Sequence, residues 1–366
     1  DRSNVSKGRC GDIHWYKVPE DIRVLALNRE TGQPEWAEVS RWTVHHGCEV
    51  EIVTLANGVC IFTDDDPRGV LGVVPGESLK VVTATPSDAK ARGMLVPRAV
   101  HYGGVEETAE VMDIPQFYNS DIESERVHKL ASAIDLDIGF GWFIGAHVAD
   151  GWTAFSNGVA KEVCFAKSHI PTREKWQKEV ARFLTKEPHF GSRVRDKADA
   201  VESGSAFGGT SASVLTASCL GRLFVDMLGH GAGNKHLPDF ATCGPKAFRV
   251  AIIAGLLDTD ATVCYHKTKN KRNPQLQVWY NTTSLRLARD VVLVAASVGI
   301  QAKVRWSKMT TAGNDAWEVT LRPGDVQDLI TEYPQLMVNE DRRKLILEAV
   351  IDRESGAYQR LSRVPT

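Results

Sequence analysis

A chain of 366 residues exceeds one ordinary hydrophobic core, so its length predicts two or three domains. Hydrophobic residues make up 43% and charged residues 25%, as in soluble globular proteins, and no apolar run reaches the ~20 residues of a membrane-spanning helix. The net charge of −2 excludes a uniformly basic nucleic-acid binder but not a locally basic surface. The seven cysteines are scattered and form no Cys-x-x-Cys pair, which excludes a zinc ribbon and indicates a reducing, intracellular location.

Short apolar runs separated by turns dominate the first hundred residues. Residues 24–28 and 36–44 have strand composition, and residues 49–55 alternate before the turn Ala56-Asn57-Gly58 leads into another strand at 59–63. Residues 78–100 add further short strands. We therefore expect an all-β domain over residues 1–103. It is followed by a linker at 104–125, where periodicity is lost and turn residues gather.

From residue 124 onward, helices alternate with paired strands, and the same order of elements occurs twice. The first pass predicts helices at 131–150, 171–184 and 220–228, with strands at 153–156 and 162–166 and less regular strand-like sequence to about 215. The second predicts helices at 245–259, 284–298 and 325–331, with strands at 263–266, 276–280, 302–306 and 317–321. A repeated order of elements indicates a duplicated α/β unit, with halves at 126–234 and 235–353 and a tail at 354–366.

Two nine-residue segments, 143–151 and 253–261, match each other in register. Each has an apolar start, a Gly at the third place, a small residue at the seventh place and an aspartate, Asp150 or Asp260, at the eighth. A single match of this kind fits an ordinary amphipathic helix that ends in Asp. Two matches in equivalent places of a repeated unit favour a shared role.

The spacing of the small residues predicts that the two helices pack together. Gly145 lies four residues from Ala149, and Gly255 lies four residues from Thr259, so each pair shares one helix face and permits close approach. The two aspartates would then meet at the helix C-termini, where the helix dipole and their mutual repulsion disfavour negative charge. Divalent cations would relieve both penalties, and bound over a phosphate they could polarise it and activate a water.

These paired segments resemble the motif of the LAGLIDADG homing endonucleases in their monomeric, two-motif form. Residues 235–240 are similar to the family's Lys-x-x-Pro block, and residues 284–300 are similar to the block that follows the second motif. The resemblance covers about residues 124–353. It implies an α/β fold in which duplicated αββαββα halves form a DNA-binding saddle. This chain departs from the motif at Val148 in the sixth place and at Ala261 in the ninth, where we expect a less comfortable left-handed helix cap.

The resemblance implies cleavage of both strands of a long, asymmetric double-stranded DNA target by a monomer. Asp150 and Asp260 would be catalytic acids and metal ligands, and Lys235 would be a catalytic basic residue that supports the activated water or the transition-state charge. Gly151 and Ala261 would complete the metal site for Mg²⁺ or Mn²⁺, with Ca²⁺ as a non-catalytic substitute. Basic residues of the strands and loops would contact DNA: Lys267, Lys269, Lys271, Arg272, Arg193, Arg195, Arg305 and Lys308.

The β-rich start resembles the N-terminal part of the intein splicing (Hint) domain. The resemblance rests on residues 24–32, 55–58, 63–67 and 95–98. Thr63 keeps its place in the Thr-x-x-His block, but Asp66 stands where the family has His and cannot donate as an imidazolium does. Cys10 resembles a remnant of the first block.

We expect a partial Hint domain, in a chain that is a piece of something longer and that does not splice alone because a terminal His-Asn is absent. The tail at 354–366 would begin the C-terminal Hint segment, and a host protein is the implied partner. Two other functions stay open: protein splicing, and nucleic-acid binding without cleavage, as in an RNA maturase. Retention of both aspartates argues against the second, because binding alone does not require the pair.

Overall fold

Two units make up the chain in the computed structural model, and each is described by itself. Unit 1 comprises Asp1–Glu106 with Gly356–Thr366, and unit 2 comprises Glu107–Ser355. The described residues are 2–8, 11–16, 23–27, 34–39, 42–45, 51–54, 60–63, 70–72, 82–92, 94–97, 110–119, 128–194, 211–266, 275–308, 315–351 and 361–363.

Unit 1 consists of short antiparallel strands and one helix. Its elements are β1 (Arg2–Gly8), β2 (Gly11–Tyr16), β3 (Arg23–Leu27), β4 (Pro34–Glu38), β5 (Trp42–His45), β6 (Glu51–Thr54), β7 (Cys60–Thr63), β8 (Val70–Gly72), β9 (Val82–Ala84), α1 (Pro86–Ala91), β10 (Leu95–Pro97) and β21 (Leu361–Arg363). The predicted hairpin is confirmed, because β6 pairs with β7. The predicted strand at 36–44 divides into β4 and β5, which pair with different strands.

Two other features of unit 1 add to the predicted strands. The predicted strands at 78–100 are interrupted by α1, whose N-terminus is capped by the Thr85 side chain accepting from the Asp88 amide. The final strand of the chain, β21, pairs antiparallel with β10. Unit 2 is therefore an insertion between two neighbouring strands of unit 1.

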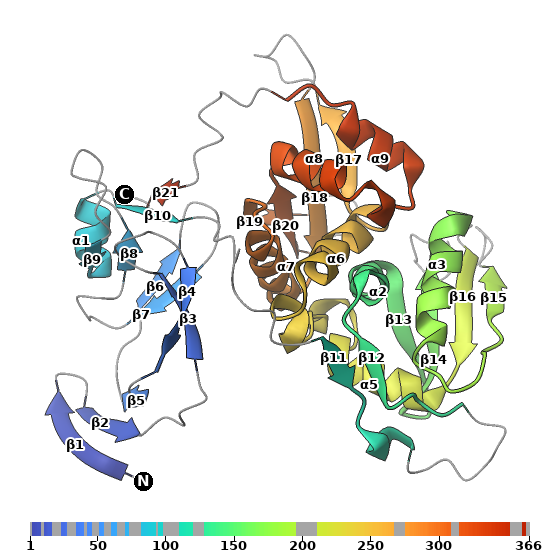
Figure 1. Cartoon of the computed structure of the whole chain (residues 1–366), viewed down its shortest axis with the longest axis horizontal. Helices are drawn as coiled ribbons and strands as arrows, with labels where there is room; N and C mark the ends of the chain where they lie inside the picture. The colour runs from blue at the N-terminus through green and yellow to red at the C-terminus, as the bar shows by residue number, and fades with distance from the viewer. Residues whose placement is uncertain are drawn as a thin grey trace. The chain divides into compact units, whose positions relative to one another are not determined.

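Unit 2 contains two four-stranded antiparallel sheets and the helices that cover them (Figure 1). Its elements are β11 (Val111–Asp113), η1 (Gln116–Asn119), β12 (Ala133–Asp135), α2 (Ile138–Asp150), β13 (Gly151–Ser156), β14 (Val159–Ala166), α3 (Ile170–Ala181), β15 (Gly191–Val194), β16 (Ser211–Thr216), α5 (Ser218–Leu228), η2 (Ala232–Asn234), η3 (Asp239–Thr242), α6 (Lys246–Asp258), β17 (Thr262–His266), β18 (Gln275–Thr282), α7 (Leu285–Ser297), β19 (Ala302–Lys308), β20 (Asp315–Leu321), α8 (Pro323–Glu332), η4 (Pro334–Leu336) and α9 (Glu340–Leu347).

The two sheets have the same strand order. The first runs β13-β14-β16-β15 and the second runs β17-β18-β20-β19. In each, the strand that follows directly from a motif helix lies at one edge. Helix α5 packs on β13 and β14, while α7 packs on β18, β19 and β20. Among the described helices, none is long and apolar enough to cross a membrane.

Some predicted boundaries are wrong for identifiable reasons. The helix predicted at 131–150 begins only at Ile138, because Asp137 accepts a hydrogen bond from the Phe140 amide and caps it. The residues before it form β12, which pairs with β11. Thus part of the segment expected to be a linker is folded onto unit 2, where the buried Tyr118 donates to Asp226 at 2.6 Å.

Helices α2 and α6 lie side by side in the middle of unit 2 (Figure 1). Their glycines allow the approach, since a Cβ on Gly145 would meet the Ile252 carbonyl and one on Gly255 would meet the Trp142 carbonyl. The expectation of close packing through small residues is confirmed. An aromatic cluster surrounds α2 and forms much of the core, with Phe140, Phe143, Trp176, Phe183, Phe224 and Phe248 fully or almost fully buried.

Candidate active site

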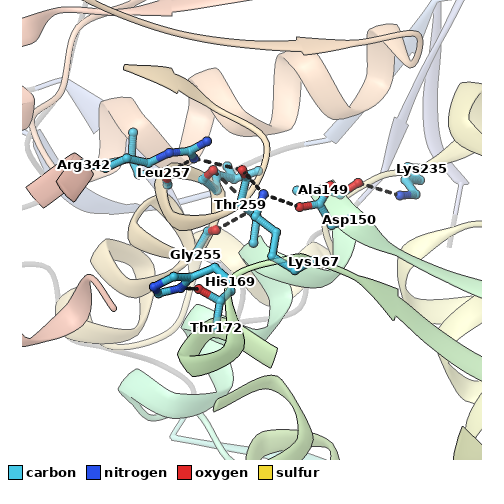
Figure 2. Close-up of polar contacts among 11 residues, drawn as sticks. Ala149, Asp150, Lys167, His169, Thr172, Lys235, Gly255, Leu257, Thr259 and Arg342 are labelled. Carbon is cyan, nitrogen blue, oxygen red and sulfur yellow. Dashed lines mark hydrogen bonds and ion pairs between the residues drawn. The ribbon is translucent and has the colours of Figure 1, made fainter. Parts of the chain in front are cut away.

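The structure brings Asp150 and Asp260 together at the ends of the two packed helices. Asp150 is the last residue of α2, and Asp260 follows the end of α6 by two residues. The Lys167 ammonium spans the two ends, donating to the Asp150 carboxylate at 2.8 Å and to the Thr259 carbonyl (Figure 2). Two aspartates that are far apart in the chain thus lie close together.

The electrostatics of Asp260 reflect that crowding. Its side chain remains accessible to solvent, yet the surrounding protein atoms, followed by the charge of Asp150, raise its pKa to about 7. Lys167, Lys235 and Arg342 act in the opposite direction without cancelling the shift. The ionised form of Asp260 is therefore held at a cost, which a nearby cation would reduce.

Lys235 reaches the same place from the segment between η2 and η3. Its Nζ donates to the main-chain carbonyls of Gly151 at 2.8 Å and Ala149 at 3.2 Å. Desolvation lowers its pKa to about 8, although both aspartates oppose the shift. Its own carbonyl accepts from Ser284 Oγ at 2.6 Å, which fixes this segment to the start of α7.

Two cationic residues of the site were missed by sequence reasoning. Lys167 follows the last residue of β14, a strand whose prediction could have drawn attention to it. Arg342 lies in α9, a helix that was not predicted, and its Nη1 donates to the carbonyls of Leu257 at 2.6 Å and Thr259 at 2.9 Å. Cations at helix C-termini satisfy carbonyls that have no partner within the helix.

The sixth places of the two motifs have different roles. Asp258 is fully buried and accepts from Trp142 Nε1 at 2.7 Å and from the amides of Val338 and Asn339 at 2.8 and 2.9 Å. It therefore joins α6 to α2 and to the segment before α9, and its burial raises its pKa. Val148, its counterpart, is an apolar core residue.

The ninth place is constrained by space rather than by a left-handed backbone. Gly151 has φ −94°, and Ala261 is not among the described residues with positive φ, so the expected left-handed cap is wrong at both ends. A Cβ on Gly151 would lie 2.6 Å from two atoms of the His147 ring. Ala261 is buried, and its amide donates to the Leu256 carbonyl at 3.1 Å.

His147 is a neutral part of the core beneath the site. Burial, followed by the charge of Lys235, lowers its pKa to about 3. Trp176 Nε1 donates to His147 Nδ1 at 3.2 Å, so the proton of the neutral ring is on Nε2. The ring stacks on Phe143 and on Trp176, whose rings also contact each other.

The oxygen atoms of the site suit a hard divalent cation. Among the described residues, no group of three or more His, Cys, Asp or Glu side chains could hold a metal ion. Here the donors are instead two carboxylates and main-chain carbonyls, which Mg²⁺ and Ca²⁺ accept as ligands. Positively charged groups already bind the Asp150 carboxylate and the carbonyls of Gly151 and Thr259, which indicates that the site attracts cations.

The other residues predicted to have functional roles are only partly described. Arg305 lies in β19, exposed, and its Nε pairs with Glu318 at 2.8 Å. Arg193 lies in β15, Lys308 ends β19 and Thr63 ends β7. The remaining predicted contacts, Arg195, Lys267, Lys269, Lys271, Arg272, Cys10 and Asp66, lie outside the described residues.

A comparison with known protein families matches part of the second half of unit 2. Residues 247–336 match the model of the LAGLIDADG-like domain family. No curated protein matches the chain. Solved structures similar to it include mesophilic variants of the homing endonuclease I-DmoI (TM-score 0.36, 9% identity, 54% of this chain and 94% of that chain) and I-DmoI in complex with DNA and Mn (TM-score 0.35, 10% identity, 54% and 96%). Another is I-DmoI in complex with DNA and Ca (TM-score 0.34, 10% identity, 55% and 90%). The residues that match the family model extend from α6 through the second sheet to η4.

Proposed function

We propose that this chain is a site-specific endonuclease that hydrolyses one phosphodiester bond in each strand of double-stranded DNA. The observation that carries the proposal is the meeting of Asp150 and Asp260 at the ends of α2 and α6, with Lys167 and Lys235 bound to the same helix ends. Two equivalent acids, one from each half, suit a reaction performed twice, once on each strand.

A divalent cation is part of the proposal, because the donor set fits it. Asp150 and Asp260 would hold Mg²⁺ or Mn²⁺ with the carbonyls of Gly151 and Ala261, and Ca²⁺ would substitute without supporting cleavage. When bound, such a cation polarises the phosphate and lowers the pKa of a coordinated water. The raised pKa of Asp260 supports this assignment, since a carboxylate that is costly to ionise alone gains most from a nearby positive charge.

The protein's own groups would orient and stabilise the reacting phosphate. Lys235, with a pKa of about 8, keeps its proton at neutral pH and places a fixed positive charge beside the end of α2. Such a preorganised charge is most effective where negative charge develops on the phosphate oxygens. Arg342 and Lys167 hold the end of α6 in place through its Thr259 carbonyl.

The two sheets would form the DNA-binding surface. Strand β13 begins directly after Asp150, and β17 begins two residues after Asp260, so a duplex at the acids would lie along both sheets. We propose that the sheets belong to duplicated halves that form a saddle over a long, asymmetric target. Because both acids come from one chain, a monomer would suffice. The basic residues assigned from the sequence would contact DNA: Arg193, Arg195, Lys267, Lys269, Lys271, Arg272, Arg305 and Lys308.

Unit 1 would be an intein splicing (Hint) type unit that carries the endonuclease as an insertion within a host protein. The pairing of β10 with β21 supports this, since strands on either side of unit 2 belong to the same unit. Cys10, Thr63 and Asp66 would be remnants of its splicing site. Ligation of flanking sequences by the chain in a fused host, detected by mass spectrometry, would instead show that splicing persists.

Substitution of the acids tests the nuclease. Incubation with a randomised or genomic DNA library and Mg²⁺ first yields the target. Asp150→Asn and Asp260→Asn should then each reduce cleavage of that target by roughly 100-fold or more while binding in Ca²⁺ stays within a few-fold of the wild type. Asp135→Asn, at an exposed position in β12, is the matched control and should cut normally. A wild-type chain that binds but never cuts would leave only the nucleic-acid-binding function.

A further inference from the structure

The chain segment that carries Lys235 has little regular structure of its own. It lies between the two short 3-10 helices η2 and η3, and residues 231–234, just before Lys235, are exposed. Gly229 has φ 81°, and a Cβ there would overlap the Asn234 carbonyl, so the chain returns on itself before it reaches Lys235. A long side chain on an irregular segment loses much conformational freedom when it is fixed. The position of Lys235 Nζ therefore depends on what holds the segment.

Two side chains of α7 hold this segment. Ser284 Oγ donates to the Lys235 carbonyl at 2.6 Å, and Asp290 Oδ2 accepts from the Leu237 amide at 3.0 Å. Helix α7 also packs against η2 and η3, the short helices on either side of the segment, and against α6 and the second sheet. The main chain is thus attached to a well-packed helix at Lys235 itself and two residues further on.

The hydroxyl group of Ser284 has a defined orientation. Ser284 is 1% exposed and caps α7, where its Oγ accepts from the Leu287 amide at 3.1 Å. A hydroxyl has one hydrogen, and because the Leu287 amide can only donate, that hydrogen is available to the Lys235 carbonyl. The amide of Ser284 donates to Thr282 Oγ1 at 3.1 Å, which ties the same residue to the end of β18. Ser284 therefore begins α7 and fixes the main chain of Lys235 at once.

The contacts of Lys235 connect α7 with the end of α2. Its Nζ donates to the carbonyls of Ala149 and Gly151, at the point where α2 ends and the first sheet begins. Its main chain is held by α7, which packs on the second sheet. A change at Ser284 or Asp290 would thus be felt at the end of a different helix, through the position of one ammonium group.

We infer that Ser284 and Asp290 are positioning residues for Lys235, and that they hold its Nζ where the reacting phosphate lies. The inference rests on the proposed function. Both residues act through the main chain of the Lys235 segment, and neither contacts the phosphate. A misplacement of about 1 Å in a group that takes part in a reaction can slow it by roughly a hundredfold. Loss of either residue should therefore slow cleavage far more than it weakens DNA binding.

Single-turnover cleavage of the selected target in Mg²⁺, measured beside DNA binding in Ca²⁺, tests the inference. Ser284→Ala and Asp290→Ala should each slow cleavage by roughly ten- to hundredfold and leave the Kd for DNA within about threefold of the wild type. Ser284→Thr keeps a hydroxyl, and Asp290→Asn keeps an acceptor oxygen. These two variants should therefore cut within about threefold of the wild-type rate.

Ser297→Ala is the matched control on the same helix. Ser297 is also 1% exposed, but its Oγ donates to the Val294 carbonyl within α7 and does not hold the Lys235 segment. This variant should cut at the wild-type rate, and thermal melting shows whether it and Ser284→Ala are folded. A loss of cleavage in Ser297→Ala as large as that in Ser284→Ala would show that general destabilisation is the cause, and would overturn the inference.

A double variant separates an action through Lys235 from an independent one. Lys235→Met should slow cleavage by itself, and Ser284→Ala added to it should slow cleavage further by less than about twofold. Fully additive losses, or wild-type rates in both alanine variants, would overturn the inference while leaving the nuclease intact. A wild-type chain that cuts no member of the DNA library would overturn the proposed function, and the inference with it.

Discussion

The C-terminal ends of α2 and α6 lie together, yet they enclose titratable groups of opposite kind. Beneath the end of α2 lies His147, kept neutral by burial among aromatic rings, with a pKa of about 3. At the end of α6 lie Asp258, fully buried on three donors, and Asp260, whose pKa is raised to about 7. Titratable groups near the ends of two similar helices thus respond to pH in opposite directions, because burial disfavours the charged form of each, which is protonated for histidine and ionised for aspartate.

Forcing α2 and α6 apart should have the largest effect on stability, because the ends of both helices would lose their present surroundings. Gly145→Ala places a methyl group against the Ile252 carbonyl and within 3.0 Å of the Leu256 amide nitrogen, both on the backbone of α6. We expect the free energy of unfolding, measured by urea denaturation, to fall by about 3 kcal/mol. Gly233→Ala is the control, since its Cβ meets nothing within 4 Å. Equal stability of the two variants would contradict close packing of α2 and α6.

Substitution of His147 should weaken the loss of stability that the protein shows at acidic pH. Because its pKa in the folded protein is about 3 and its ordinary value is 6.5, the unfolded chain takes up a proton first as pH falls below 6.5. The resulting loss of stability is about 2 kcal/mol at pH 5 and continues toward pH 3. His147→Phe should show a shallower fall in unfolding free energy between pH 6.5 and 5 than the wild type. His230→Phe, an exposed position, should keep the wild-type slope.

Neutralising Asp260 should have the opposite pH dependence. Its folded-state pKa of about 7 lies above the ordinary 3.8, so the stability associated with its protonated form is lost as pH rises through 7. Without divalent cations, Asp260→Asn should be more stable than the wild type at pH 8 by about 1 kcal/mol, a value reduced by solvent screening. The difference should shrink as pH falls from 7 and vanish only below the ordinary value of 3.8. Asp150→Asn should instead be destabilised, because Lys167 loses its carboxylate partner; a gain in stability there would be inconsistent with the ion pair.

Loss of Lys167 should have the smallest effect on folding. The ion pair with Asp150 leaves 17% and 18% of the two side chains exposed, so we expect Lys167→Met to lower the unfolding free energy by about 1 kcal/mol. Added Ca²⁺ should narrow the difference, because a cation held by Asp150 replaces the lost charge. The control Lys161→Met, at an exposed position of β14, should match the wild type with and without Ca²⁺. A Lys167→Met difference that does not change with Ca²⁺ would argue against a cation at this place.

Sequence reasoning identified the motif helices because glycine spacing and the paired aspartates are local patterns. It placed α6 within one residue at each end, since Pro245 and the end of the apolar run mark its limits. It did not find α9, whose charged sequence has little apolar periodicity, and so missed Arg342. The start of α2 was placed too early, because the capping role of Asp137 cannot be distinguished from the surrounding mixture of apolar and polar residues.

The missed contributions to the site share a physical cause. Lys167 and Arg342 act on main-chain carbonyls of a helix that lies far from them in the chain, and such contacts leave no pattern in sequence. Asp258 was recognisable as a motif residue. Its hydrogen-bond donors, the amides of residues 338 and 339, come close to it only because the chain passes the end of α6 after η4. Lys235 was found because its block resembles a known motif. Its carbonyl partners Ala149 and Gly151 were visible only in three dimensions.

The pairing of β10 with β21 also has a genetic consequence. Pro97 lies opposite Leu361, so the main chain departs from unit 1 and comes back to it on adjacent antiparallel strands. Strands in that arrangement can be connected by a short turn. A single in-frame deletion of the intervening codons would therefore leave β10 and β21 able to pair through a short turn. A single in-frame insertion at that turn would restore the larger protein. The inserted unit is a cassette whose gain or loss requires no rearrangement of its carrier.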